Sequence, residues 1–239
     1  MPDFVNICAD QTIIKNTVGD NSKTEMMYCS IKRINKMKLK NISEFLLSSI
    51  FLFMFTFSVN AQSKNIENGV EVTAGSTNIK IQFYSDNIVR IVKWCEGGTS
   101  EKLSLSVIQK TLPDLNLNVK ESDETITLSS SKLSVKISKE NGNIEYYTPD
   151  GKTILEEKEK PYFKPVEYFG DSGFTIKQNF KLTESEGIYG LGEQEDGYFN
   201  YRDKKVSLAQ ANVGAANSFL ISTMNYGILW DNYSKTVFE

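Results

Sequence analysis

The chain has 239 residues, with 27 Lys and Arg against 30 Asp and Glu, a net charge of −3 at pH 7, and no histidine. This balance argues against a nucleic-acid partner, which needs a basic surface. The lack of histidine excludes Ser-His-Asp and Cys-His catalysis and histidine-bearing zinc sites. The three cysteines, Cys8, Cys29 and Cys95, form no CxxC pair, so we expect no metal and no cofactor.

Residues 37–61 have the pattern of a signal peptide. Lysines precede an apolar run at 45–57, whose length suits a signal-peptide core and falls short of the ~20 residues of a membrane-spanning helix. Val59-Asn60-Ala61 supplies a small-residue cleavage site before Gln62. We therefore expect a secreted or periplasmic protein with no stable membrane span after cleavage. An uncleaved membrane anchor is the alternative.

Residues 1–36 do not fit this pattern, because they are polar and a signal peptide begins near the terminus. Met37-Lys38-Leu39-Lys40 is an ordinary signal start, so we predict that translation begins at Met37 and that residues 1–36 are a mis-assigned leader. A genuine disordered leader is the alternative, and Met26 and Met27 are further candidate starts.

From Gln62 onward, apolar and polar residues alternate along short segments, as in half-buried strands, and no helical stripe appears. Asn141-Gly142 and Asp150-Gly151 are strong hairpin signals, because both turn positions tolerate positive φ. Short strands with frequent turns predict an all-β, mostly antiparallel sandwich over 62–239. The expected strands are 69–73, 79–84, 88–94, 105–108, 117–121, 125–129, 133–137, 144–148, 153–155, 174–182, 218–224, 227–230 and 233–238.

Two segments interrupt this pattern. The charge run 156–160, EEKEK, is expected to be a solvated loop between sheets, with a partner-binding site as the alternative. Residues 161–165 contain two prolines, and proline cannot donate to a strand ladder, so we expect an irregular or edge segment there.

The most distinctive stretch is 186–238, which begins with the glycine-spaced turn around Gly190 and Gly192. A phosphate site is disfavoured, because the stretch has no GK[ST], no third glycine at dinucleotide-binding spacing and no helix. We interpret the glycines as permitting a tight turn or close backbone approach at a strand end.

Four blocks in this stretch resemble the N-terminal β-sandwich of glycoside hydrolase family 31, and its α-xylosidase-like members most of all. The blocks are Ile188-Tyr189-Gly190-Leu191-Gly192-Glu193-Gln194, Asn200-Tyr201-Arg202-Asp203, Phe219-Leu220-Ile221-Ser222-Thr223 and Tyr226-Gly227-Ile228-Leu229-Trp230-Asp231-Asn232-Tyr233-Ser234. Asn217 stands where the family usually has proline. The resemblance implies a galactose-mutarotase-like sandwich, truncated before the (β/α)8 barrel that carries the catalytic aspartates.

The acidic cluster Glu193, Glu195 and Asp196 is the other candidate for chemistry, because paired carboxylates can hydrolyse glycosides. Clustered acids on a loop are more often solvated, and the resemblance assigns catalysis to the barrel, so we expect no catalytic residue here. Asp231-Asn232 ends a strand, where such side chains usually cap a turn.

Sugar contacts are expected from the loop before Phe219. By resemblance this loop reaches toward the active-site mouth of the barrel, and Gln210 and Asn212 are the candidate contacts, because amides both donate to and accept from hydroxyls. The alternative is that they satisfy backbone groups in the loop. Several aromatic residues suit a stacking platform or the core. They are Tyr198, Phe199, Tyr201, Tyr226 and Trp230.

The sequence thus predicts a non-catalytic carbohydrate-binding or scaffold domain of a retaining α-glycosidase, of α-xylosidase or α-glucosidase type. Its expected partners are the missing barrel and an α-linked oligosaccharide. A stand-alone carbohydrate-binding module and a cell-surface adhesion sandwich are the alternatives.

Overall fold

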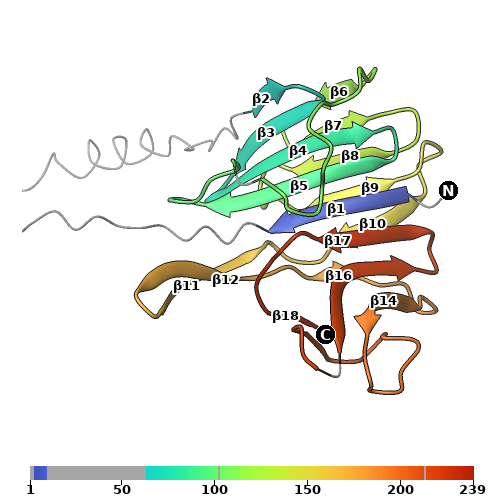
Figure 1. Cartoon of the computed structure of the whole chain (residues 1–239). Helices are drawn as coiled ribbons and strands as arrows, with labels where there is room; N and C mark the ends of the chain where they lie inside the picture. The colour runs from blue at the N-terminus through green and yellow to red at the C-terminus, as the bar shows by residue number, and fades with distance from the viewer. Residues whose placement is uncertain (1–2, 10–62, 102, 213) are drawn as a thin grey trace, which may run out of the picture. The chain divides into compact units, whose positions relative to one another are not determined.

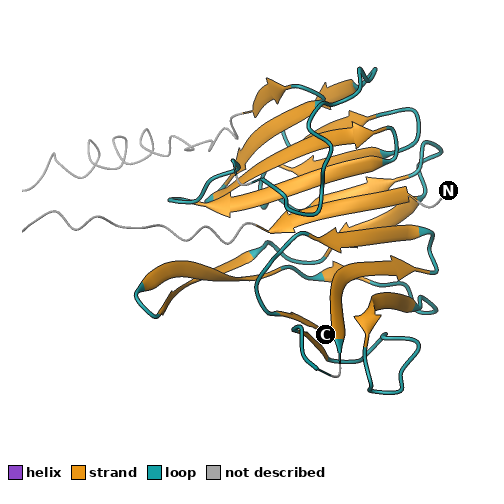
Figure 2. Cartoon of the chain, in the orientation of Figure 1, coloured by secondary structure: helices purple, strands orange, loops and turns teal. Residues whose placement is uncertain are grey.

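The computed structural model describes residues 3–9, 63–101, 103–212 and 214–239. These residues form strands, turns and loops (Figure 2), and none of them lies in a helix. Accordingly, this part of the chain has no helix that is long and apolar enough to cross a membrane. The expected signal peptide, 37–61, and residues 10–36 of the expected leader lie outside the described residues.

The larger sheet contains eight strands. They are β1 Asp3–Ala9, β2 Ser63–Ile66, β3 Gly69–Ala74, β4 Thr77–Ser85, β5 Ile88–Cys95, β14 Ile188–Glu193, β16 Ala215–Ser222 and β17 Tyr226–Trp230. Their order across the sheet is β14-β16-β17-β1-β5-β4-β3-β2 (Figure 1). Neighbours are antiparallel except at β1, which runs parallel to both β17 and β5.

The second large sheet contains six strands, all antiparallel to their neighbours. They are β6 Asn118–Glu121, β7 Thr125–Ser129, β8 Ser134–Ser138, β9 Ile144–Tyr147, β10 Thr153–Glu157 and β13 Phe180–Lys181. The order is β13-β10-β9-β8-β7-β6. Gly142 and Gly151 have φ of 72° and 85°, so the two predicted turns lie where the sequence placed them, between β8 and β9 and between β9 and β10.

Two small sheets complete the fold. β11 Tyr162–Tyr168 and β12 Asp171–Lys177 form a hairpin that extends away from the large sheets (Figure 1). β15 Val206–Leu208 pairs with β18 Thr236–Phe238. The proline-containing segment is therefore a strand of a two-stranded ribbon, which agrees with the expected edge position.

The main core lies between the two large sheets. Along β4 and β8 every second residue is buried, so each sheet turns one apolar face inward. One cluster joins residues of both sheets, including Ile79, Ile81 and Phe83 with Ile126 and Leu128, all fully buried. A smaller cluster lies beside β14 and contains Ile188, Leu191, Tyr201, Val206 and Leu208. Two sheets around a shared core confirm the predicted mostly antiparallel β-sandwich.

Three local predictions were wrong. Residues 105–108 form no strand, because the Ser104 hydroxyl accepts from the backbone amides of Ser106 and Val107 and holds a turn. The expected strand 174–182 divides into β12 and β13, because the Gln178 amide bonds backbone carbonyls, Glu159 O at 3.0 Å among them, at the break. The charge run 156–160 is not wholly a solvated loop, since Glu156 and Glu157 end β10 and Glu157 is buried.

The first described segment lies within the predicted leader, 1–36. Asp3–Ala9 is a strand with neighbours on both sides. Sequence patterns did not indicate this strand, because Asp3–Ala9 is a single short segment far from any hairpin partner.

Candidate functional site

The glycines of β14 allow it to approach β16 closely. Gly190 and Gly192 have φ of 101° and 89°, and a Cβ on Gly192 would lie 1.9 Å from the carbonyl oxygen of Ala215. The pairing register shifts between the same two glycines. A bulge of this kind turns the end of the strand, so the motif shapes the backbone that carries the following loop.

A buried carboxylate lies directly below this strand. Glu186 is 2% exposed, and its side chain accepts from the Thr183 amide at 2.8 Å, from the Ser222 hydroxyl at 2.5 Å and from the Tyr226 hydroxyl. Its backbone carbonyl accepts from Arg202 at 2.8 Å. Burial, followed by the hydrogen bond to Glu186, raises the pKa of Tyr226 far above its usual value of 10. The group ties β14, β16 and β17 together.

Asp231 links β17 to β5. It is buried, its carboxylate lies 3.6 Å from the Arg90 guanidinium, and it accepts from the Tyr233 hydroxyl at 3.0 Å. Asn232 bonds Thr236 at 3.0 Å and also accepts from the Ser234 amide. The sequence interpretation of this pair as turn-capping fits Asn232, whereas Asp231 makes an ion pair.

A second buried ion pair joins the two large sheets. Lys93 on β5 lies 2.5 Å from Glu157 on β10, and both side chains are almost fully buried. Lys93 also donates to Gly142 O and to the Gln178 side chain, and Glu157 accepts from the Ile144 amide. Burial lowers the pKa of Lys93 and raises that of Glu157, while each partner opposes the shift of the other.

The predicted sugar contacts lie on an exposed loop. Gln210 and Asn212 are both exposed, and the Gln210 side chain accepts from the Ala216 amide at 3.3 Å. A bridge between Ala211 and Gly214 closes the turn around Asn212. Gln210 therefore does satisfy a backbone group, as the alternative interpretation expected, while its side chain stays open to solvent.

The acidic cluster beside the glycine turn is solvated. Glu193, Glu195 and Asp196 are all exposed. Within the described ranges no three or more Asp, Glu or Cys side chains are arranged to hold a metal ion. The cluster therefore has the features of a surface loop.

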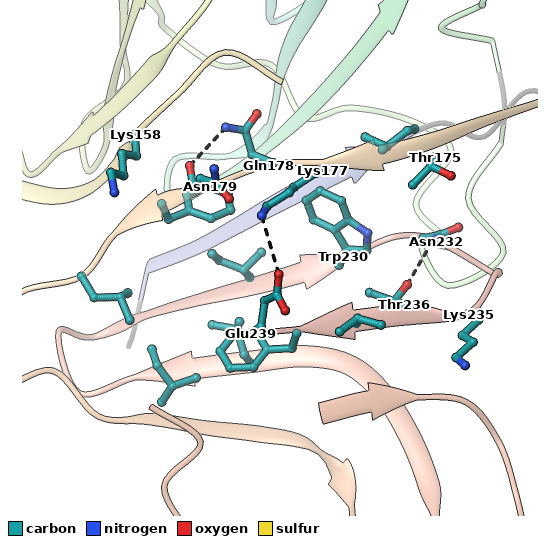
Figure 3. Close-up of a pocket in the computed structure, with 18 of the residues that line it drawn as sticks. Lys158, Thr175, Lys177, Gln178, Asn179, Trp230, Asn232, Lys235, Thr236 and Glu239 are labelled. Atoms are coloured by element: carbon teal, nitrogen blue, oxygen red, sulfur yellow. Dashed lines mark hydrogen bonds and ion pairs between the residues drawn. The ribbon is translucent and has the colours of Figure 1, made fainter. Parts of the chain in front are cut away.

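A cavity of about 630 Å³ opens between β12 and β13 on one side and β17 and β18 on the other. Figure 3 shows Trp230 in its wall, with Gln178 and Asn179 on one side and Asn232 and Thr236 on the other. Three further aromatic rings, Phe180, Tyr226 and Phe238, also line it. Trp230 was one of several platform candidates in the sequence, but nothing there connected it with Gln178 and Asn179, which lie far earlier in the chain.

The described lining of the cavity has aromatic and amide groups that suit the binding of a polar ligand. An indole ring beside amide groups can stack on a sugar face and bond its hydroxyls. Among its described lining residues, Glu239 is the one carboxylate, and it is paired with Lys205 at 3.1 Å and Lys177 at 3.6 Å. The hydrogen bond and charge of Lys205 lower its pKa. A two-carboxylate mechanism has no second acid here.

Two mostly antiparallel sheets around one core define a β-sandwich, and a family model refines that class. The model for the glycosyl hydrolase 31 N-terminal galactose mutarotase-like domain matches residues 78–239. The chain belongs to glycoside hydrolase family 31, whose N-terminal galactose-mutarotase-like domain it carries.

Relatives with known names are much longer. The α-xylosidase of Saccharolobus solfataricus is 31% identical over 170 residues, which are 67% of this chain and 23% of that protein. Alpha-glucosidase 2 of Bacillus thermoamyloliquefaciens is 26% identical, over 67% of this chain and 21% of its own length. The crystal structure of the Xanthomonas citri α-xylosidase superposes with a TM-score of 0.69 at 28% identity, over 73% of this chain and 19% of that one. The chain thus spans about a fifth to a quarter of these relatives.

Proposed function

We propose that this chain is the non-catalytic N-terminal domain of a retaining α-glycosidase of the α-xylosidase or α-glucosidase type. One observation carries the proposal: the chain matches only the N-terminal part of the family, in relatives that are named α-xylosidase and α-glucosidase. The exposed state of Glu193, Glu195 and Asp196 supports it. In this role the domain packs on a catalytic barrel and lends loops to the substrate site.

The loop 209–212 is the part that we assign to the substrate. Gln210 and Asn212 are exposed, and their loop leads from β15 into β16, whose first residue, Ala215, pairs with Glu193 at the bulged end of β14. We propose that their amides contact an α-linked oligosaccharide held by the barrel. The expected export through the signal peptide 37–61 would place that substrate outside the cytoplasm.

A domain exchange tests the scaffold role. Residues 78–239 replace the corresponding segment of the S. solfataricus α-xylosidase, and hydrolysis of p-nitrophenyl α-xyloside is measured for the exchange protein and for the full chain alone. We expect turnover by the exchange protein and none by the chain. Turnover by the chain, or a folded but inactive exchange protein, would contradict the proposal.

The same exchange protein tests the loop. Gln210→Ala and Asn212→Ala are expected to raise KM, with Gln194→Ala as the matched control, because the Gln194 amide is bonded internally to Leu191 O at 3.1 Å. An unchanged KM in both loop variants would remove them from the substrate site.

A carbohydrate-binding module is the second candidate, favoured by the Trp230 cavity. It predicts that xyloglucan oligosaccharides raise the Tm of the full chain by themselves, and that Trp230→Ala abolishes the shift. Trp94→Ala is the control, because Trp94 does not line the cavity. If the oligosaccharides do not raise the Tm, the binding-module candidate is wrong and the scaffold role remains.

A further inference from the structure

The most unusual feature of the sheet is the place of β1. Its residues pair with β17 from Asp3↔Tyr226 to Ile7↔Trp230, and with β5 from Phe4↔Ile88 to Ala9↔Lys93. Both pairings are parallel, whereas the other strand pairs in the described part of the chain are antiparallel. Figure 1 shows β1, in blue, between these two neighbours.

β1 joins two blocks of the sheet that have no other common strand. β2 to β5 come from residues 63–95, and β14, β16 and β17 come from 188–230. Without β1, the inner edges of β5 and β17 would each expose a row of unpaired amides and carbonyls. We call the position between these two edges the β1 slot.

The slot is one strand wide, and the protein spans it with a side-chain contact. Arg90 is the register partner of Asn6, and the other partner of Asn6 is Leu229, two residues before Asp231. The Arg90–Asp231 ion pair therefore reaches across two strand spacings, about 9.6 Å between backbones, with its charged groups 3.6 Å apart. Both blocks also supply side chains to the same core, among them Ile91 and Ile228. These contacts hold the two edges at the spacing that one inserted strand requires.

The position of β1 in the sequence conflicts with the expected processing. Asp3–Ala9 precedes both the predicted start at Met37 and the predicted cleavage after Ala61. A chain that starts at Met37 lacks the strand, and a chain cut after Ala61 is no longer covalently joined to it.

We propose that the β1 slot is a strand-acceptor site, and that its occupant is the chain's own segment Asp3–Ala9. In the uncut chain the segment completes the sheet; after cleavage at Ala61 it stays bound without a covalent link. Recognition is by main-chain hydrogen bonds on both edges, the mode by which an extended peptide adds to a sheet. Because the segment pairs with both β5 and β17, it forms two ladders of main-chain hydrogen bonds, whereas a strand added at an ordinary sheet edge forms one.

A disulfide trap tests the register in the full chain. Cys8 is the partner of Val92, and neighbouring strands bring Cα atoms within the 4.4–6.8 Å that a disulfide allows. With Cys29 and Cys95 changed to Ser, Val92→Cys is expected to form a Cys8 cross-link under mild oxidant. Lys80→Cys is the matched control, because Lys80 pairs with Val92 from β4 and lies one strand further away. Equal cross-linking in both variants, or none in either, would overturn the assignment.

A cleavage experiment tests the binding itself. A site-specific protease sequence is inserted after Ala61 in the full chain, and the cut protein is passed over a size-exclusion column. We expect the fragment 1–61 to co-elute with the rest, and the amides of β5 and β17 to stay protected from hydrogen exchange. Val5→Pro with Asn6→Pro, which removes an N–H on each side of the strand, is expected to release the fragment and speed that exchange about tenfold or more. Val5→Ala with Asn6→Ala retains both N–H groups and should keep the fragment bound.

Two outcomes decide the matter. If the fragment separates while β5 and β17 remain protected, the slot closes without β1 and the proposal is wrong. If the cut protein aggregates, a synthetic peptide of residues 2–10 must prevent it, because an occupied slot has no exposed edge; failure of the peptide would equally contradict the proposal.

Discussion

Glu186 shows how one buried carboxylate organises the end of the sandwich formed by β14, β16 and β17. A carboxylate removed from water is stable only when its oxygens are bonded, and here the Thr183 amide and the hydroxyls of Thr183, Ser222 and Tyr226 donate to it. The oxygens of Glu186 thus accept their hydrogen bonds from other residues of the fold. Tyr226 and Ser222 thereby hold β17 and β16 in position below β14.

Replacing Tyr226 by Phe removes one donor from this group. We expect Tyr226→Phe to lower the free energy of unfolding by about 1.5–3 kcal/mol at pH 7, the range for a hydrogen bond to a charged group. Urea unfolding measures this, with Tyr162→Phe as the control, because Tyr162 is 55% exposed. A loss no larger than that of the control would mean that the hydrogen bond contributes nothing.

The same variant changes the dependence of stability on pH. The pKa of Tyr226 is raised in the folded state, so the stabilisation from this group is complete below the unfolded pKa of about 10 and is lost as the pH rises beyond it. Tyr226→Phe should therefore flatten the fall in stability between pH 9 and pH 11. Some slope will remain, because burial also raises the pKa of Tyr146, and that of Tyr147 to about 12.

The Lys93–Glu157 pair offers a second test at the residue scale. Removing one partner of a buried pair leaves a lone charge, so Lys93→Met and Glu157→Gln should each cost about 3–5 kcal/mol, and the double variant much less than their sum. The Lys136–Glu145 pair is the control, because its side chains are 39% and 32% exposed, and its coupling should stay below about 1 kcal/mol. Additive losses at Lys93 and Glu157 would show that the pair is not coupled.

At the scale of single elements, most strands could be predicted from the sequence, because apolar and polar residues alternate wherever one face of a strand packs on the core. β7 lies at the predicted residues, 125–129, and β5 and β10 differ from prediction only at their ends. The wrong strand predictions occur where a side chain, that of Ser104 or Gln178, forms hydrogen bonds with the backbone in place of a neighbouring strand. Alternation also indicates that Glu157 is buried. Glu157 lies two residues after the buried Leu155 on β10, so its side chain faces the same inward side despite its charge.

The bulge in β14 can be tested with two glycines of the same backbone class. Gly192 and Gly197 both have positive φ, 89° and 73°, so alanine is strained at each by about 1–2 kcal/mol. Only at Gly192 would the new Cβ meet backbone, 1.9 Å from Ala215 O, while Gly197 has open space around it. Gly192→Ala should therefore lose at least twice the unfolding free energy of Gly197→Ala in urea titration. Equal losses would mean that β14 shifts freely away from β16.

At the scale of the whole molecule, two hydrophobic clusters of unequal size divide the fold. The large one spans both sheets, and the small one has five buried residues around β14 and β15. Regions with fewer buried contacts open more readily. The sandwich was predictable because its core is built from alternating strands. The cavity was not, because it depends on how strands distant in sequence are brought together.

Native-state hydrogen exchange should separate the two clusters. We expect the amides of Val206–Leu208 to exchange through a local opening of lower free energy than those of β7. Leu208→Ala should speed exchange in β15 and β18 while leaving β7 unchanged, whereas Leu128→Ala, in the large cluster, should speed both. One common opening free energy for all these amides would show that the fold is a single cooperative unit.

During synthesis on the ribosome, β1 is made long before its partner strand β17. Val5 emerges first, yet its partner Ile228 follows 223 residues later. At about 5–20 residues per second, that interval lasts roughly ten seconds or more. During it the segment has no complete site, and closing so long a loop is slow. The earliest part of the chain to be synthesised is thus among the last to find its place in the sheet.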